Sequence, residues 1–437
     1  MTALSEAEPS SASILRRTTL AAAIGNTVEN YDYAVYGFVA AVLGKNFFPH
    51  ATPGAALLST FAVFGAAFVV RPLGGLLLGP VADRLGRKPT LVVTLIGMAV
   101  VSTLIGLLPT AETIGIAAPI LLVVLRMLQG LAAGGEYGTA IIYAAEFAPA
   151  NRKGEMAGRV QMGSLAGLLI GAFVVVGLNL SLSPAAMQSW GWRVPFLLAL
   201  PLGAIGLYLR SRLGETPEFV AARDHTRDAP PLDRRVWRGL LLIGVAATHA
   251  VGFYLAFTYV QNLIIQLHFS TVTATAVVGC ALAVGIGLVV AGGRLSDRIG
   301  RHPALLIATA VILIASYPLM AGLTAASNPW LLAVCAVLLA AGPSFYSGVA
   351  PITYVELFPV HARGTGVALA FNVAVAIFGG FIIYVTQWLV QATGDNRAGA
   401  FVLMGSAVLS GLTALCLHSV LTPRTPRHGA PLAPEPA

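Results

Sequence analysis

The chain has 437 residues, of which 57% are hydrophobic and only 10% are charged. A soluble domain carries about 25% charged residues, so this composition excludes a soluble globular protein and favours a chain that crosses a membrane repeatedly. The formal net charge of +8 does not call for nucleic acid, because the basic residues lie between apolar runs, where they fix membrane orientation.

We predict twelve membrane helices, because twelve apolar runs reach the length of about 20 residues that a span needs. They cover residues 18–43, 54–81, 89–109, 117–147, 155–180, 191–211, 237–263, 272–293, 303–324, 329–357, 364–391 and 398–420. A polar connector at 212–236 separates bundles at 18–211 and 237–420, and polar tails occupy 1–17 and 421–437. The sequence therefore predicts an all-α membrane protein with two six-helix bundles.

A short charged motif follows the second helix of each bundle. Asp83–Pro89 reads D-R-L-G-R-K-P, and Asp297–Pro303 reads D-R-I-G-R-H-P. Gly86 and Gly300 permit a tight turn with positive φ, and the proline of each motif suits the first turn of the next helix. The match in one register indicates that the two bundles are related by pseudo-symmetry.

The basic residues predict that both chain ends lie on the inner side of the membrane. In this orientation nearly all of the 26 Lys and Arg lie in the inner loops and tails or at the helix ends beside them. Lys45, Arg193 and Arg397 fall toward the outer side, and Arg71 and Arg126 remain within the membrane. We therefore expect a multi-pass protein of the cell (inner) membrane with cytoplasmic termini.

Charged residues near mid-membrane are costly and are functional candidates by default. Glu29 and Asp32 lie three residues apart on one face of the first helix, and their proximity favours protonation of at least one of them. Either acid could carry the coupled proton, and the resemblance described below favours Asp32. Arg71 and Arg126 can each bind a carboxylate of the substrate or of these acids, and we favour Arg126 as the substrate ligand.

Other residues extend this candidate site. Glu136 follows Gly134-Gly135, small residues that permit close helix contact, and it has either a coupling or a structural role. His249 lies near mid-depth in the seventh helix and has an ordinary pKa close to neutral pH. Aromatic and polar residues that could line a cavity are Tyr33, Tyr36, Tyr137, Tyr143, Tyr254, Tyr259, Gln261, Asn372 and Gln387.

The repeated motifs also predict a gate at the inner face. The fourth helix ends in a Glu146–Pro149 stretch, and the tenth ends in the similar Glu356–Pro359 stretch. We expect two charged clusters that close the inner face in the outward-open state and break in the inward-open state. The first contains Asp83, Arg84, Arg87, Glu146 and Arg152, and the second contains Asp297, Arg298, Arg301, Glu356 and Arg363.

Further motifs carry a resemblance to a known family. They are Gly25-Asn26, Glu29-x-x-Asp32, Val35-Tyr36-Gly37, Arg71-Pro72-Leu73-Gly74-Gly75, Gln129-Gly130, Gly134-Gly135-Glu136-Tyr137, Trp190–Phe196 and Glu215-Thr216-Pro217. With the helix count and the repeated turn, the chain resembles the metabolite:proton symporter family of the major facilitator superfamily. The resemblance implies the fold of that superfamily and proton-driven uptake of small metabolites, among them proline, betaine, α-ketoglutarate and citrate. Asn30 departs from the family pattern, in which an aromatic residue is usual.

We interpret the chain as a proton-coupled symporter that works by alternating access. Two buried arginines favour a small di- or tricarboxylate such as α-ketoglutarate or citrate. A proline- or betaine-type osmolyte is the alternative substrate, and a drug efflux pump is the alternative function from another class. The sequence has no phosphate-binding loop, nucleophile motif or Cys/His metal spacing, so we expect no enzyme activity, cofactor or metal. We expect a monomer in the lipid bilayer that takes a carboxylate or zwitterion with a proton.

Overall fold

The computed structural model describes residues 11–212, 214–223 and 232–421. In these ranges the chain is almost entirely helical, and the helices line up as twelve rods, some of them broken. The first six rods are α1 (Ser11–Phe38) with α2 (Ala40–Phe47), α3 (Pro53–Arg84), α4 (Arg87–Leu107), α6 (Ala117–Phe147), α7 (Lys153–Ser181), and a sixth made of α8 (Pro184–Ala186), η2 (Met187–Gly191), α9 (Arg193–Leu197) and α10 (Ala199–Ser211).

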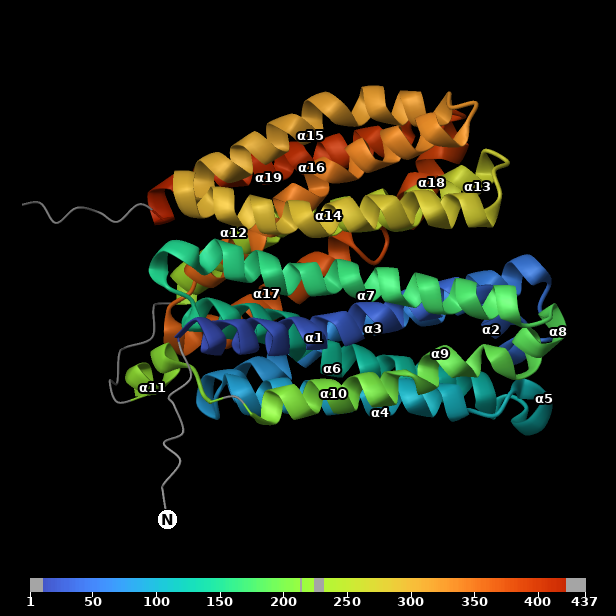
Figure 1. Cartoon of the computed structure of the whole chain (residues 1–437), viewed down its shortest axis with the longest axis horizontal. Helices are drawn as coiled ribbons and strands as arrows, with labels where there is room; N and C mark the ends of the chain where they lie inside the picture. Colours follow the sequence, from blue (N-terminus) through green and yellow to red (C-terminus); the bar gives the residue numbers. More distant parts are fainter. Residues whose placement is uncertain (1–10, 213, 224–231, 422–437) are drawn as a thin grey trace, which may run out of the picture.

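The second bundle repeats this arrangement. Its rods are α12 (Leu232–Phe253) with η3 (Tyr254–Tyr259) and α13 (Val260–Gln266), α14 (Thr271–Ile299), α15 (Arg301–Thr324), α16 (Pro329–Glu356), α17 (Arg363–Phe378) with α18 (Ile382–Thr393), and α19 (Ala398–Leu421). Short helices lie between rods: α5 (Ala111–Ile114), η1 (Ala150–Arg152), α11 (Pro217–Arg223) and η4 (Val360–Ala362). Figure 1 shows α2, α5 and α8 at one end of the molecule and α11 at the other.

Local sequence explains where the rods begin and end. Gly86 has φ 112° and Gly300 has φ 92°, which confirms the predicted tight turns after α3 and α14. Thr52 caps α3 by accepting a hydrogen bond from the Ala55 amide, and Pro53 occupies the first helical position. Asn328 caps α16 in the same way ahead of its own proline.

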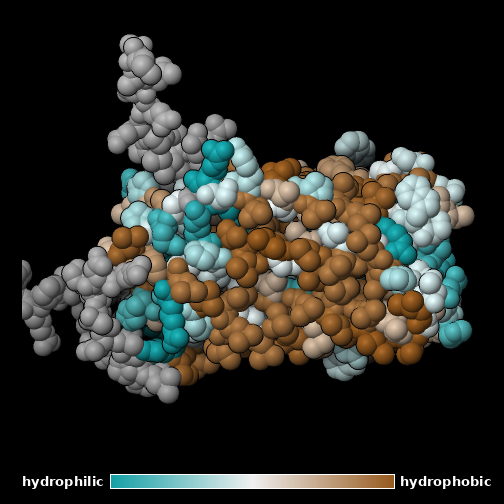
Figure 2. Space-filling view, turned by 90° about the horizontal axis from the view of Figure 1, so that it is seen from below, coloured by the Kyte–Doolittle hydropathy of each residue, from teal (hydrophilic) through white to brown (hydrophobic). Residues whose placement is uncertain are grey.

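The outer surface has the hydropathy of a membrane protein. On the face shown in Figure 2, hydrophobic residues cover the middle of the molecule and hydrophilic residues gather toward both ends. Eleven of the described helices are long and apolar enough to cross a membrane. The first rod is not among them, because Asn26, Glu29, Asn30 and Asp32 lower the hydropathy of its middle. The predicted all-α membrane fold is confirmed.

The two bundles meet along two pairs of rods. In the described chain α7 packs along α14, and α3 packs along α17; Figure 1 shows the first of these pairs at the centre of the molecule. Glycines allow the backbones to approach, since a Cβ at Gly79 would lie 2.7 Å from the Cα of Thr365. A Cβ at Gly75 would lie 2.8 Å from the carbonyl oxygen of Ala368.

Two rods of the second bundle are broken near their middle. The seventh rod contains the π-helical turn η3, and the eleventh is interrupted at Gly379-Gly380 between α17 and α18. π-Helical turns inside α-helices frequently mark functional sites. Tyr254, the first residue of η3, lines the central cavity described below.

The structure moves several predicted boundaries. Helices α3 and α14 continue past the apolar runs, so Asp83 and Asp297 belong to the last helical turn and not to the connecting turn. The sixth rod begins at Pro184, seven residues before the predicted start. Residues 214–223 of the connector pack against the bundles, which differs from the predicted solvated link. Residues 1–10, 224–231 and 422–437 of the predicted tails and connector lie outside the described residues.

Candidate transport site and latch

A cavity lies between the bundles. It is lined by residues of α1, α3, α6, α7, α12, η3 and α17, so both bundles contribute to its wall. Its lining residues are Asn26, Glu29, Asn30, Tyr33, Arg71, Tyr137, Gln161, Ser164, His249, Ala250, Phe253, Tyr254, Phe371 and Val375. Its position suits a small molecule bound at the contact between two halves of a transporter fold.

Glu29 and Arg71 form a buried ion pair in the cavity wall. Glu29 Oε1 lies 2.8 Å from Arg71 Nη2. The guanidinium also donates from Nη1 to the Tyr33 hydroxyl, at 2.7 Å, and from Nε to Asn372 Oδ1, at 2.9 Å. Arginine has five N–H donors, so these three contacts leave one donor on each terminal nitrogen for a ligand.

Asn372 links this ion pair to the second bundle. Although it does not line the cavity, its Nδ2 donates to the carbonyl of Gly134 at 2.7 Å and to that of Ala368 at 2.6 Å. Because those two carbonyls fix the amide orientation, the Asn372 carbonyl oxygen is held toward Arg71. The second bundle therefore positions a cation that belongs to the first.

Asp32 and Arg126 form a separate pair outside the cavity lining. Arg126 Nη1 lies 2.9 Å from Asp32 Oδ2, and Ser102 and Gln129 also donate to this carboxylate. The guanidinium carbon lies 4.2 Å from the ring centroid of Tyr36, a cation–π contact.

This placement changes two expectations. Arg126, our favoured substrate ligand, is not in the wall of the cavity, and neither is Tyr36, whose hydroxyl donates to the carbonyl of Thr60. Glu29 and Asp32 share a helix face, but each faces an arginine of its own. The reason is that Arg71 reaches Glu29 from α3, whereas Arg126 reaches Asp32 from α6.

Glu136 is also outside the cavity. It pairs with Arg210 through both terminal nitrogens of the guanidinium, and Thr94 donates to the same carboxylate. Arg210 also donates to the carbonyls of Ala21 and Leu91, so it ties α1, α4, α6 and α10 together. Although Arg210 lies in the last turn of α10, its side chain is 1% exposed.

Aromatic side chains form much of the remaining cavity wall. His249 Nδ1 lies 3.0 Å from the Tyr354 hydroxyl, and the Tyr137 and Phe371 rings stack with centroids 4.3 Å apart. The Tyr137 hydroxyl donates to Gln161 Oε1 at 2.8 Å. Four other predicted candidates do not line the cavity: Tyr143, Tyr259, Gln261 and Gln387.

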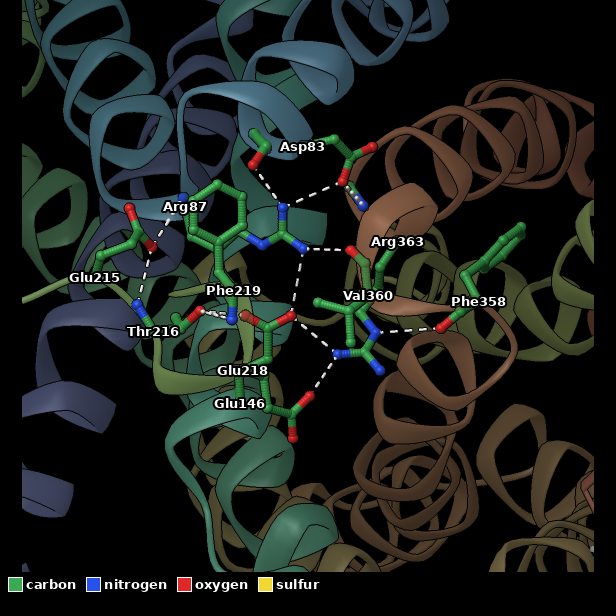
Figure 3. A network of polar contacts seen from close by, with 12 residues as sticks. Asp83, Arg87, Glu146, Glu215, Thr216, Glu218, Phe219, Phe358, Val360 and Arg363 are labelled. Carbon is green, nitrogen blue, oxygen red and sulfur yellow. Dashed lines mark hydrogen bonds and ion pairs between the residues drawn. The ribbon is translucent and has the colours of Figure 1, made fainter. Parts of the chain in front are cut away.

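The repeated charged turns meet the opposite bundle at the end that holds α11. We call the polar contacts at this end the latch. Asp83, at the end of α3, accepts hydrogen bonds from the Gly364 amide and from the amide and hydroxyl of Thr365, at 2.7–2.8 Å. Asp83 thus caps the start of α17 in the second bundle, where the helix dipole favours a negative charge. Figure 3 shows this contact with Arg87 beside it.

The other copy of the turn makes the symmetric contact. Asp297, at the end of α14, accepts from the amides of Gly154 and Glu155 at 2.8 Å and so caps α7 in the first bundle. Arg301 lies 2.7 Å from Asp297 and 3.0 Å from Glu356. Arg87 holds the equivalent place in the first turn, 3.2 Å from Asp83 and 3.4 Å from Glu146.

Two arginines exchange places relative to the predicted clusters. Arg363 lies 2.9 Å from Glu146 and so joins the first cluster, across the interface between bundles. Arg152 pairs instead with Glu155, beside the second cluster. Because α17 begins at the end of α3, and α7 begins at the end of α14, each arginine reaches the cluster of the other bundle. Arg84 and Arg298 are exposed and form no ion pair with any described residue.

The connector adds a component to the latch that the sequence did not predict. Both carboxylate oxygens of Glu215 accept from the amides of Arg87 and Lys88, and Thr216 donates to Glu146. Glu218 lies 2.6 Å from Lys153 and 2.9 Å from Arg363, so it bridges the two bundles (Figure 3).

The positive charges of Lys153 and Arg363 stabilise the ionised form of Glu218 in this bridge. Burial by itself raises the pKa of Glu218, but the hydrogen bonds and charges of Lys153 and Arg363 more than offset this effect and lower the pKa below the ordinary glutamate value. The Phe219 ring lies 5.0 Å from the Arg87 guanidinium carbon. The Glu215-Thr216-Pro217 motif was the sequence signal that could have predicted this contact of the connector, because it follows the sixth helix directly.

Comparison with known proteins identifies the family of this chain. Residues 22–384 match the Major Facilitator Superfamily. The chain belongs to that superfamily. It is 36% identical over 435 residues to the Proline/betaine transporter of Escherichia coli (strain K12), covering 95% of this chain and 85% of that protein. It is 38% identical over 434 residues, with the same coverage, to the Glycine betaine/proline/ectoine/pipecolic acid transporter OusA of Dickeya dadantii.

A solved structure with the same fold is the proton:xylose symporter XylE bound to 6-bromo-6-deoxy-D-glucose. It matches with a TM-score of 0.80 and 20% identity over 94% of this chain and 96% of that one. The predicted superfamily and the predicted metabolite:proton symporter relationship are confirmed. This chain is therefore a multi-pass membrane transporter of the major facilitator superfamily.

Proposed function

We propose that this transporter carries a small zwitterion, of the proline or betaine type, together with a proton across the cell (inner) membrane. This replaces the di- or tricarboxylate that the sequence favoured. Two relatives are named for proline and betaine, and the charge of the cavity wall agrees with such a substrate. The observation that most supports the proposal is the Glu29–Arg71 pair, which places one acidic and one basic group side by side in the cavity wall.

Charge balance separates the two substrate classes. Among the described lining residues, ionised Glu29 and Arg71 carry opposite charges that cancel. A dicarboxylate would bring two negative charges into a wall whose one guanidinium already has a carboxylate partner. Burying an uncompensated charge is expensive, whereas a zwitterion brings no net charge and presents each end to an opposite partner.

The geometry suggests how each end of the substrate is held. The two remaining N–H donors of Arg71 suit the substrate carboxylate, which a guanidinium binds bidentately. Glu29 and the aromatic walls of Tyr33, Tyr137 and Tyr254 suit the ammonium end, because aromatic faces attract cations. In an α-amino acid the ammonium and carboxylate groups are attached to the same carbon. Glu29 and Arg71 are adjacent in the cavity wall, so they offer one opposite charge to each of these groups.

We place the coupled proton on Asp32. Its carboxylate is buried outside the cavity lining, and its partners Arg126, Gln129 and Ser102 all lie in the first bundle. Protonating Asp32 removes one half of a buried ion pair, which changes the energy of the α1–α6 contact by an amount that can bias a two-state protein. Glu29 then remains charged for the substrate.

The latch supplies the alternating gate in this proposal. It joins the bundles at the end that we assign to the cytoplasm, so the described arrangement corresponds to a state closed on that side. Opening inward requires Asp83 to leave α17 and Asp297 to leave α7. Each half then rotates about the central site.

Uptake by reconstituted protein tests this function. Labelled proline, glycine betaine, α-ketoglutarate and citrate are offered separately to proteoliposomes with an imposed pH gradient, with and without a protonophore. We expect gradient-driven accumulation of a zwitterion that the protonophore abolishes. Accumulation of α-ketoglutarate or citrate alone, or proline uptake that ignores the protonophore, would reject the proposal.

A paired variant tests the binding site without leaving a buried charge alone. Glu29→Gln/Arg71→Gln removes both charges and leaves an uncharged polar side chain at each position. We expect it to fold and to lose proline binding by at least about tenfold, the effect of losing a charge-assisted hydrogen bond.

A further inference from the structure

One histidine nitrogen in the cavity wall has no hydrogen-bond partner among the described residues. His249 of α12 lines the cavity from the second bundle and is 4% exposed. Its Nδ1 lies 3.0 Å from the Tyr354 hydroxyl, and its other ring nitrogen, Nε2, is the one without a partner. Buried polar groups in folded proteins are nearly always paired, so Nε2 points to a ligand in the cavity.

Tyr354 determines whether this nitrogen donates or accepts. The Tyr354 side chain is buried, and its hydroxyl makes no hydrogen bond with a described residue other than His249. A buried hydroxyl needs an acceptor for its proton, so it donates to Nδ1, and the neutral imidazole then carries its own proton on Nε2. An imidazolium ring also carries a proton on Nε2. Nε2 is therefore a donor in both charge states of the ring.

A donor in this position calls for an acceptor on the substrate. In a zwitterion of the proline or betaine type the acceptors are the carboxylate oxygens, because the ammonium group has no free lone pair. A carboxylate has about four lone-pair positions, so it can accept from Arg71 and from His249 together. This contact does not depend on whether the ammonium is secondary or quaternary, which agrees with relatives named for both proline and betaine.

We infer that His249 binds the substrate carboxylate through Nε2, as a ligand from the second bundle, and that Tyr354 is the positioning residue that fixes its tautomer. This inference rests on the proposed zwitterion function and adds a contact in the opposite bundle. Arg71 belongs to α3 and His249 to α12, so one carboxylate joins the two halves across the cavity. The bound substrate then favours the arrangement in which both halves contact it.

Two substitutions at His249 separate the role of a donor from that of an aromatic wall. His249→Gln keeps an N–H donor, whereas His249→Phe keeps a ring and removes the donor. Proline binding to the purified full-length transporter is measured by isothermal calorimetry at one pH. We expect His249→Phe to bind proline at least about tenfold more weakly than the wild type, the effect of one buried charge-assisted hydrogen bond. His249→Gln should recover most of that loss.

Tyr354→Phe tests the positioning role. The His249 proton can then sit on either nitrogen, so proline affinity should fall about threefold, because only part of the population presents the donor. In the His249→Phe background Tyr354→Phe should have no further effect, whereas a purely structural role would lower affinity in both backgrounds. Tyr346→Phe is the matched control, since Tyr346 is also buried on α16 but its hydroxyl donates to the backbone carbonyl of Val245. It should bind proline like the wild type.

The binding results separate this inference from the proposed function. Equal proline affinities of His249→Phe and the wild type, or an equal loss in His249→Phe and His249→Gln, would overturn the carboxylate contact while leaving zwitterion transport intact. If neither His249 variant folds, equal affinities of Tyr354→Phe and Tyr346→Phe would overturn it instead. A wild type that binds α-ketoglutarate and not proline would reject the proposed function, and the inference with it.

Discussion

Three buried acids of the first bundle each pair with one arginine. The pairs are Glu29 with Arg71, Asp32 with Arg126, and Glu136 with Arg210. Only the first pair lines the cavity. Burial alone therefore does not identify a substrate ligand, because the same pairing can hold a substrate, carry a proton or join helices.

The Glu136–Arg210 pair should be structural. Removing one partner of a buried pair leaves an unpaired charge, which typically costs about 3–5 kcal/mol. We expect Arg210→Met to lower the free energy of unfolding by roughly that amount. Glu136→Gln/Arg210→Met should recover most of the loss, because no charge remains buried alone.

Thermal unfolding of the purified variants and proline binding measure both effects. Neither residue lines the cavity, so the folded double variant should bind proline like the wild type. Loss of proton coupling in a stably folded double variant would instead give Glu136 the coupling role that its sequence context allowed.

The sequence predicted which residues are buried charges but not their partners. The three-residue spacing of Glu29 and Asp32 predicted that both lie on one face of a helix, and in the structure both lie in α1. Hydropathy does not specify how neighbouring helices are rotated, so it could not reveal that Arg71 and not Arg126 meets the cavity. Arg210 lies close to the end of an apolar run, where a solvated side chain was the natural expectation.

At the scale of elements, the connector acts as part of the latch. Glu218 lies on α11, contacts Lys153 of the first bundle and Arg363 of the second, and is 30% exposed. Ion pairs at this exposure contribute at most about 1 kcal/mol each. That is still sufficient to shift a two-state equilibrium about fivefold.

We therefore expect Glu218→Gln to favour the state that is open at the latch end by roughly fivefold. Lys153→Gln is the matched control, because it removes a contact within the first bundle and keeps the Glu218–Arg363 bridge. Distances between spin labels at Arg84→Cys and Arg298→Cys report the change, since both sites are exposed and lie on opposite bundles. Equal distance distributions in Glu218→Gln and wild type would contradict this role.

The Glu218 contacts of the latch should not respond to pH in the range where transport responds. The pKa of Glu218 is lowered in the folded state, so its contribution is present above the ordinary glutamate pKa of about 4.3 and is lost only as pH falls below it. His302 in α15 and His361 in η4 also lie at this end of the molecule. In a form with Asp32→Asn, His302→Gln and His361→Gln, label distances should stay constant between about pH 5.5 and pH 8. A shift within that window would contradict this pH independence.

The repeated turn predicted the latch and its two copies, including the positive φ of Gly86 and Gly300. It did not predict that Arg152 and Arg363 exchange clusters, because sequence repeats show which segments correspond and not which ones touch. The docking of the connector was missed for a related reason. A segment rich in Arg, Asp and Pro is typical of solvated links, and its contacts depend on a surface that only the assembled bundles provide.

For the whole molecule, the two bundles place the cavity and the proposed proton site in separate environments. The cavity wall combines side chains of both bundles, whereas the partners of Asp32 all belong to the first. A zwitterion carried with one proton moves one positive charge inward. The membrane potential then contributes about 2.3 kcal/mol per 100 mV to uptake, a driving force that a fully protonated dicarboxylate would not gain.

Current across a supported membrane of proteoliposomes measures this charge directly. At equal pH on both sides, a jump in proline concentration should produce a positive current into the wild-type vesicles, and Asp32→Asn should bind proline but give no steady current. Proline uptake without current, or an undiminished current in Asp32→Asn, would contradict the account.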